Sequence, residues 1–111
     1  MPDNDPAVAI TDNPDAGRFE VRVDGDLAGS AYYGRRRDRV IFTHTEVGDA
    51  YEGRGIGSAL ARGALDALRA RGERAVPLCP FVAGYIDRHA EYADLVDHEL
   101  LAELTPPFFV D

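Results

Sequence analysis

A run of glycines with one arginine and one serine is the part of this sequence best suited to chemistry. Gly53, Gly55 and Gly57 occupy alternate positions just before an apolar helical pattern begins. Without side chains there, the free N–H groups of the first helical turn can contact a ligand directly, and such groups favour an anion. Arg54 and Ser58 add a positive charge and a hydroxyl. The segment predicts a phosphate or pyrophosphate site, unless it is only a tight turn.

Two common phosphate-binding motifs do not fit this segment. The dinucleotide fingerprint is G-x-G-x-x-G with an acidic residue at the tip of a second parallel strand about twenty positions on. Here the third glycine comes one position early, and no acidic residue follows at such a strand tip. The nucleotide-triphosphate loop needs a lysine before Ser or Thr, and this region has none.

Composition places the chain among small globular proteins with one domain. It has 111 residues, of which 45% are hydrophobic and 29% are charged, which suits a single core. No apolar run is long enough to cross a bilayer, and residues 1–6 lack the pattern of a signal peptide. We therefore expect a cytoplasmic protein with a disordered leader at residues 1–6 and no membrane partner.

The charges bear on the partners of the chain. A formal net charge of −8 argues against a nucleic-acid partner, because binding to phosphates needs clustered cations with few opposing acids. One basic cluster, Arg35, Arg36, Arg37 and Arg39, fits a solvated hairpin turn or a contact for a phosphate or for an acidic partner. The single cysteine, Cys79, excludes an internal disulfide and a multi-cysteine zinc site. The three histidines lack the spacing of metal ligands, so we expect no metal.

The elements that would position the glycine segment follow from the hydrophobic pattern. Short runs rich in alternating, β-branched or aromatic residues cover 7–11, 18–23, 27–33 and 39–47, and turn residues separate them. These runs predict four strands in a meander. From about Gly55 the apolar residues recur at spacings of three and four instead, as in a helix.

The second half predicts a further strand and two more helices. Residues 75–78 fit a buried strand, and because it follows the fourth strand through a helix, it should lie parallel to that strand. Pro80 suits the first position of a second helix over 81–88. Residues 91–96 fit a helix or a loop, and 98–104 fit a short final helix.

Four blocks in order resemble the GNAT acetyltransferases. The acetyl-CoA signature of that family is Gln or Arg, two residues, Gly, one residue, then Gly or Ala, and here it reads Glu52-Gly53-Arg54-Gly55-Ile56-Gly57. The other blocks are Thr43 to Val47, Pro77 to Val82 with Tyr85-Ile86, and His89 to Tyr92. More narrowly, the chain is similar to small GNAT-like proteins of about this length. Glu52 departs from the pattern and puts a negative charge near the expected pyrophosphate, which Arg54 could offset.

The resemblance implies a compact GNAT fold of mixed α/β type. Its parts are an antiparallel four-strand meander, a helix, a fifth strand parallel to the fourth, and a second helix. The domain would span 7–96, with a C-terminal extension over 97–111. Larger members place helices between the first two strands to cover the acceptor, whereas here only 12–17 intervene. An open acceptor side suits the amine of a protein or polyamine better than an enclosed small molecule.

The resemblance also implies an acetyl-CoA-dependent N-acetyltransferase in which a primary amine attacks the thioester directly. In this family pantetheine pairs with the free edge of the strand before the helix, here at Glu46 and Val47, and the N–H of Val47 would stabilise the oxyanion. The amine also needs a base. Glu46 and His44 are two apart on one strand and face the same side, so they are candidate bases, or simply a polar pair.

Two further residues are candidates for the thioester end of the site. Tyr85 matches the tyrosine that protonates the CoA sulfur in many GNAT enzymes, or it is a core aromatic. Cys79 precedes Pro80 at a helix start, where the positive helix terminus favours a thiolate. It could carry the acetyl group, contact pantetheine, or pack as a small apolar residue.

The expected contacts of acetyl-CoA follow from this comparison. Arg88 could reach its nucleotide end or complement the end of its own helix, and the basic cluster at 35–39 could meet its 3′-phosphate. The residues assigned to acetyl-CoA are Val47, Gly53, Arg54, Gly55, Ile56, Gly57, Ser58, Cys79, Tyr85 and Arg88. A CoA-binding module without turnover, and an interaction domain that uses the apolar tail Phe108 to Val110, stay open as alternatives. We expect a monomer or weak homodimer.

Overall fold

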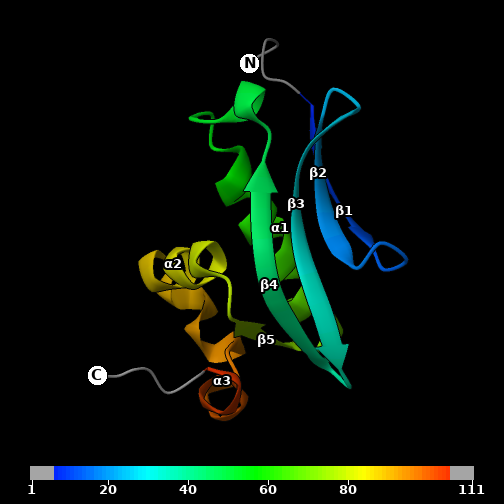
Figure 1. The fold of residues 1–111 in the computed structure, drawn as a ribbon. Coiled ribbons are helices and arrows are strands. Elements are labelled where there is room, and N and C mark those ends of the chain that lie inside the picture. The colour runs from blue at the N-terminus through cyan, green and yellow to red at the C-terminus, as the bar shows by residue number, and fades with distance from the viewer. Residues whose placement is uncertain (1–6, 106–111) are drawn as a thin grey trace.

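The computed structural model describes residues 7–105, so the expected leader at 1–6 and the tail from Phe108 to Val110 lie outside the described part. Ten elements follow one another along the described chain (Figure 1): β1 (Val8–Asn13), β2 (Arg18–Val23), β3 (Asp26–Arg36), β4 (Arg39–Val47), the 3-10 helix η1 (Asp49–Tyr51), α1 (Ile56–Arg71), β5 (Arg74–Pro77), α2 (Pro80–Arg88), the 3-10 helix η2 (Ala90–Leu95) and α3 (His98–Leu104). None of the described helices is long and apolar enough to cross a membrane.

The strands form one mixed sheet in the order β1-β2-β3-β4-β5. Neighbouring strands are antiparallel from β1 to β4, and β5 is parallel to β4. The predicted fold class is therefore confirmed, including the direct connection of β1 to β2 by a turn. The structure corrects details: β3 continues to Arg36, through residues expected in a turn, and the ambiguous segment 91–96 falls largely within η2.

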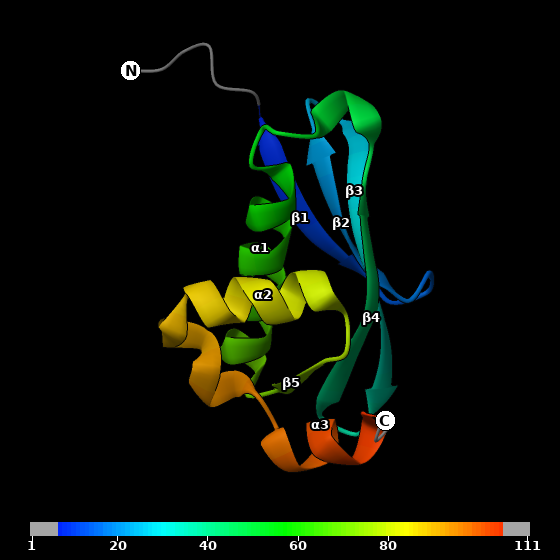
Figure 2. The same cartoon turned by 60° about the vertical axis from the view of Figure 1, so that its left-hand side comes forward.

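Both longer helices cover the same face of the sheet. Figure 2 views the sheet nearly edge-on, with α1 and α2 on one side of it. Side chains from the two layers meet in the core, where Phe19, Phe42, Leu60 and Leu65 are fully buried. The other face of β2, β3 and β4 carries mainly polar side chains, and no described helix lies over it.

Glycines fix the end and the closest contact of α1. Gly72 has a φ of 71°, its N–H donates to Arg69 O, and the next N–H donates to Leu68 O. This pair of bonds is a Schellman motif, which ends a helix sharply. Inside the helix, a Cβ at Gly63 would lie only 2.7 Å from the Ile10 side chain, so a glycine there lets β1 approach α1.

An extra residue in β4 changes which side chains face the helices. Tyr32 pairs with His44, but its neighbour Tyr33 pairs with Phe42, so Thr43 has no partner on β3 and forms a β-bulge. Before the bulge, Phe42 points into the core. After it, the residues on that side are Thr45 and Val47, while His44 lies on the uncovered face.

Candidate active site

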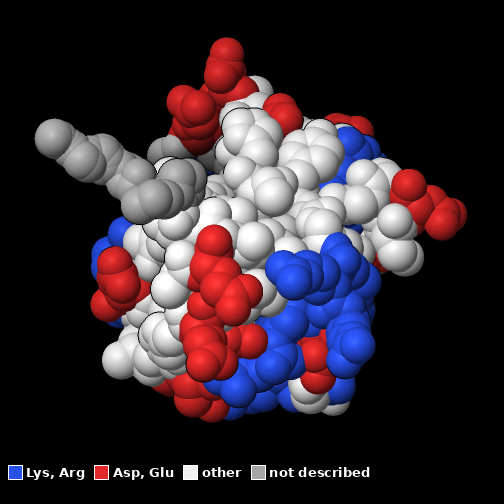
Figure 3. All heavy atoms as spheres, turned by 60° about the horizontal axis from the view of Figure 1, so that its bottom comes forward, with Lys and Arg blue, Asp and Glu red and all other residues white. Residues whose placement is uncertain are grey.

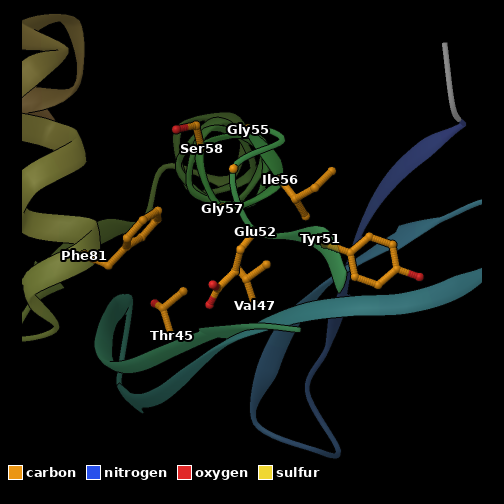
Figure 4. Close-up of a pocket in the computed structure, with 10 residues that line it drawn as sticks. Thr45, Val47, Tyr51, Glu52, Gly55, Ile56, Gly57, Ser58 and Phe81 are labelled. Carbon is orange, nitrogen blue, oxygen red and sulfur yellow. The ribbon is translucent and has the colours of Figure 1, made fainter. Parts of the chain in front are cut away.

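A cavity of about 370 Å³ lies where β4 diverges from the start of α1. Figure 4 shows side chains reaching it from the strand, from the glycine segment and from α2. Its lining combines backbone, apolar and a few polar groups: Thr45, Val47, Tyr51, Glu52, Gly53, Gly55, Ile56, Gly57, Ser58 and Phe81. The predicted glycine segment therefore does border a cavity large enough to admit part of a ligand.

The glycine segment leaves the first turn of α1 open. Gly53 and Gly55 have φ values of 78° and 74°, in the left-handed region that glycine adopts without strain. Gly55 is the N-cap residue, and no side chain caps this end of the helix. The N–H groups of Ile56, Gly57 and Ser58 belong to this first turn, whose donors lack partners within the helix. Together with the helix dipole they make the cavity wall suitable for an anion.

One edge of β4 is available to a ligand beside this helix end. Within the described chain, β5 pairs with β4 only as far as Phe42 and then leads into α2. The N–H of Gly48 donates to Ala28 O on β3. Because backbone groups of successive strand residues point to opposite edges, those of Val47 and Thr45 point to the free edge. An extended ligand can pair there like an added strand.

The two candidate bases lie together, but on the other face of β4. His44 and Glu46 are both exposed, with 3.6 Å between His44 Nε2 and Glu46 Oε2, and the His44 ring stacks on Tyr32 at 6.0 Å between centroids. The expectation that they share one side of the strand is confirmed. The cavity, however, receives the neighbouring side chains Thr45 and Val47.

A second cavity, of about 450 Å³, opens on that face of the sheet. It contains Glu46 and Asp49, and Val47 borders both cavities. Beside it on β2 lies the buried Glu20, which accepts hydrogen bonds from Asn13, Arg18 and Arg22. The bonds from Asn13 and Arg18 hold the pKa of Glu20 below its usual value, so this carboxylate stays charged and tied within the sheet.

Cys79 lies behind the cavity wall. It is the N-cap residue of α2, as predicted, but only 3% of it is exposed. Its Sγ lies 3.2 Å from the hydroxyl of Thr45, which itself lines the cavity. The thiol therefore touches the site through Thr45 and does not line the cavity directly.

The structure does not bring Tyr85 and Arg88 into the cavity. Tyr85 is 1% exposed and stacks on His89 with 4.0 Å between ring centroids, so it is packed in the core. Phe81, one helical turn earlier, lines the cavity instead. Arg88 is at the exposed end of α2 and is absent from the lining.

Other expected contacts also change place. Arg54 is exposed outside the lining, with its guanidinium 5.5 Å from the centroid of the Tyr51 ring, whereas Glu52 does line the cavity. The arginines at 35–39 are at the far end of β4 from the glycine segment, so a contact with the 3′-phosphate of CoA has no support.

The sequence patterns did not predict three of the residues that line the cavity: Thr45, Tyr51 and Phe81. Unbroken alternation from Phe42 predicts that Thr45 points away from the core. The bulge reverses this placement, and it cannot be recognised from the sequence of one strand. Phe81 did carry a signal, since it follows Pro80 at a helix start. Gly57 explains its position, because a Cβ there would stand 2.7 Å from the Phe81 ring.

Comparisons with known proteins agree with this geometry. The family model of the GCN5-related N-acetyl-transferases matches residues 18–95. The solution structure of a GCN5-like protein from Staphylococcus aureus has a similar fold, with a TM-score of 0.61 and 18% identity over 79% of this chain and 86% of that chain. No curated protein matches the chain. Because the family match runs from β2 through η2 and includes the whole cavity, the chain belongs to the GCN5-related N-acetyltransferase family of enzymes.

Proposed function

We propose that the protein transfers the acetyl group of acetyl-CoA to a primary amine by direct attack of the amine on the thioester. The observation that carries this proposal is the position of Val47, which borders a cavity on each face of the sheet. One cavity has the donors for an anionic cofactor. The other has carboxylates suited to a cationic amine, and the charge of Arg18 in its lining is paired with Glu20. The two reactants meet at the edge of β4.

Acetyl-CoA occupies the cavity beside α1. Its pyrophosphate accepts hydrogen bonds from the first-turn N–H groups of Gly57 and Ser58, where the helix dipole also favours negative charge. Its pantetheine arm runs along the free edge of β4 past Thr45. The thioester carbonyl then lies near the N–H of Val47, which stabilises the oxyanion of the tetrahedral intermediate.

The amine approaches from the uncovered face. Glu46 and Asp49 line that cavity and attract a protonated amine, and Glu46 takes the proton before attack, directly or through one water. His44, 3.6 Å from Glu46, orients the carboxylate. Since no described helix closes this face, the acceptor is an amine on a protein or a polyamine.

The burial of Cys79 favours direct attack over an acetyl-cysteine intermediate. A nucleophile must reach the thioester carbon, and Cys79 is 3% exposed with its sulfur against Thr45. Direct transfer instead requires only that the amine and the thioester reach the same edge of β4. Glu46 and the N–H of Val47 then supply the base and the oxyanion donor. Collapse of the intermediate breaks the C–S bond, and the departing CoA thiolate takes up the proton that the attacking nitrogen releases.

Catalysis is tested by following acetyl transfer to a panel of protein and polyamine amines. Glu46→Gln keeps the size of the side chain and removes the base, so transfer should fall about 10²-fold or more. Glu99→Gln, on the exposed surface of α3, removes the same charge away from the site and should retain activity. Equal rates for the two variants would exclude Glu46 as the base.

Cofactor binding is tested separately at Ser58. A glutamate there favours the helix, because negative charge suits a first helical turn, but it repels a pyrophosphate. Ser58→Glu should therefore fold normally and lose affinity for acetyl-CoA in a calorimetric titration, while the neutral Ser58→Gln should bind more tightly than Ser58→Glu. Equal affinities would show that the pyrophosphate does not occupy this helix end.

A further inference from the structure

The end of the molecule opposite the active site carries a concentrated positive patch. We call it the arginine patch, and it consists of Arg35, Arg36, Arg37, Arg39 and Arg74 on the β3–β4 hairpin and the start of β5. Figure 3 looks toward this end and shows arginines gathered into one continuous area. Such a concentration is unexpected on a chain with a net charge of −8.

Three of these arginines lie side by side across three strands. Arg36 pairs with Arg39 between β3 and β4, and Arg39 pairs with Arg74 between β4 and β5. Like charges directly opposite one another destabilise a sheet. Anions beside Arg39 offset part of this repulsion, but the charge of Arg36 adds to it without a paired anion among the described residues.

The hairpin turn adds a second unfavourable feature. Arg37 has a φ of 57°, a conformation that costs a long side chain about 1 kcal/mol or more and that glycine or asparagine adopts more easily. An arginine at this position is thus unfavourable both for local conformation and for charge repulsion. Strained residues of this kind tend to occur at functional sites.

Neighbouring groups satisfy part of the patch. Arg35 pairs with Glu73, Arg39 pairs with Asp38 and Asp97, and Arg74 donates to a backbone carbonyl. Within residues 7–105, no hydrogen bond or ion pair holds the exposed side chains of Arg36 and Arg37. These two guanidinium groups are available to bind an anion outside the described chain.

A groove runs beside these two side chains. Arg36, Arg37, Asp38 and Arg39 form its charged part, and Leu100 of α3 supplies an apolar surface, around a volume of about 580 Å³. A ligand that fits both parts carries negative groups and an apolar group. Guanidinium groups bind carboxylates in a planar, bidentate manner.

We propose that the arginine patch binds an acidic segment of a partner polypeptide, with carboxylates on Arg36 and Arg37 and an apolar side chain on Leu100. A nucleic acid is disfavoured, because its extended phosphates would approach the many acidic groups elsewhere on the chain. β4 separates the patch from the acetyl-CoA cavity by about 25 Å at 3.3 Å per residue. A partner bound here leaves the transfer site accessible, so the patch is independent of the proposed chemistry.

The test measures the binding of a fluorescein-labelled, glutamate-rich peptide that carries leucines at intervals. The variant combines Arg36→Gln with Arg37→Asn, since asparagine tolerates the turn conformation. Its control combines Arg22→Gln with Arg62→Gln, which removes the same two charges from half-buried and exposed positions on β2 and α1 outside the arginine patch. The patch variant should bind the peptide about tenfold more weakly in fluorescence anisotropy, and the control should bind it like the natural chain.

Three results would overturn the proposal: no binding of the peptide, equal loss in the patch variant and the control, or tighter binding of a single-stranded DNA oligonucleotide of equal charge. Circular dichroism melts ensure that both variants are folded. Because the readout is peptide binding, the outcome does not depend on acetyl transfer.

Discussion

Replacing Gly57 by alanine should weaken acetyl-CoA binding without unfolding the protein. Gly57 is in the first turn of α1 and lines the cavity. A Cβ at this position would stand 2.7 Å from Cζ of Phe81, whereas ordinary contact begins at 3.4 Å. The Phe81 ring must therefore move by about 0.7 Å, the difference between these two distances.

Two effects of this change on stability oppose each other. Alanine is better than glycine inside a helix by up to about 1 kcal/mol, while overpacking typically costs about 1–3 kcal/mol. The lower end of the overpacking cost applies here, because the new Cβ contacts the far end of the Phe81 ring and Phe81 is 38% exposed. The net change should be within about 1 kcal/mol, which shifts the melting temperature by no more than about 8 °C.

The effect on binding should be larger than the effect on stability. The new methyl group stands beside the Gly57 N–H, where the proposed pyrophosphate binds. Loss of one hydrogen bond to a charged group costs about 1.5–3 kcal/mol, which corresponds to roughly a 10- to 150-fold rise in the Kd of acetyl-CoA. Isothermal titration calorimetry measures this rise directly.

A matched control is available on the other helix. Gly84→Ala changes a helical glycine of α2 whose nearest neighbour is the flexible end of Arg88, at 3.4 Å, so it should keep the affinity. A double-mutant cycle with Phe81→Ala isolates the ring contact. The change in the free energy of unfolding caused by Gly57→Ala should be about 1 kcal/mol more favourable in the Phe81→Ala protein than in the natural chain. Unchanged acetyl-CoA affinity in Gly57→Ala would refute the assignment of this helix end to the cofactor.

Three other changes test separate parts of the structure. Glu52→Gln should tighten acetyl-CoA binding several-fold in the same titration, because the carboxylate lines the cavity that receives an anion; a difference that does not shrink in added salt would contradict this electrostatic cause. Cys79→Ala should retain acetyl transfer, since Cys79 is buried, and complete loss would indicate an acetyl-cysteine route. Hydrogen bonds from Asn13 and Arg18 lower the pKa of Glu20, so its charge stabilises the fold above the ordinary pKa, and this contribution is lost as pH falls through the lowered pKa. On acidification, the melting temperature of Glu20→Gln should therefore fall less than that of the natural chain. An equal fall in both proteins would exclude this role of Glu20.

Most of the fold could be predicted because local patterns determine it. Phe19, Val21 and Val23 alternate along β2 and are all buried, and Gly72 ends α1 where the apolar pattern stops. The bulge at Thr43 could not be predicted in this way. It arises from the pairing of β4 with β3, and pairing register is a property of two strands together.

The site was predictable where the backbone determines it and less so where packing does. The glycines from Gly53 to Gly57 needed only their spacing to indicate an open helix end. Choosing between Phe81 and Tyr85 required the rotation of α2 about its axis, which the neighbouring elements set. Likewise, the exposure of Cys79 depends on Thr45, which is distant in sequence and comes from another element.

The bulge at Thr43 makes strand length a determinant of chemistry. If Thr43 paired regularly with β3 instead of bulging, the alternation of β4 would continue unbroken from Phe42. His44 and Glu46 would then turn toward the proposed cofactor cavity, and Thr45 and Val47 toward the proposed acceptor cavity. The assignment of each side chain to one reactant therefore rests on an odd or even count along the strand. A survey of homologous enzymes should find substitutions in β4 tolerated more often than single-residue insertions or deletions between His44 and Val47.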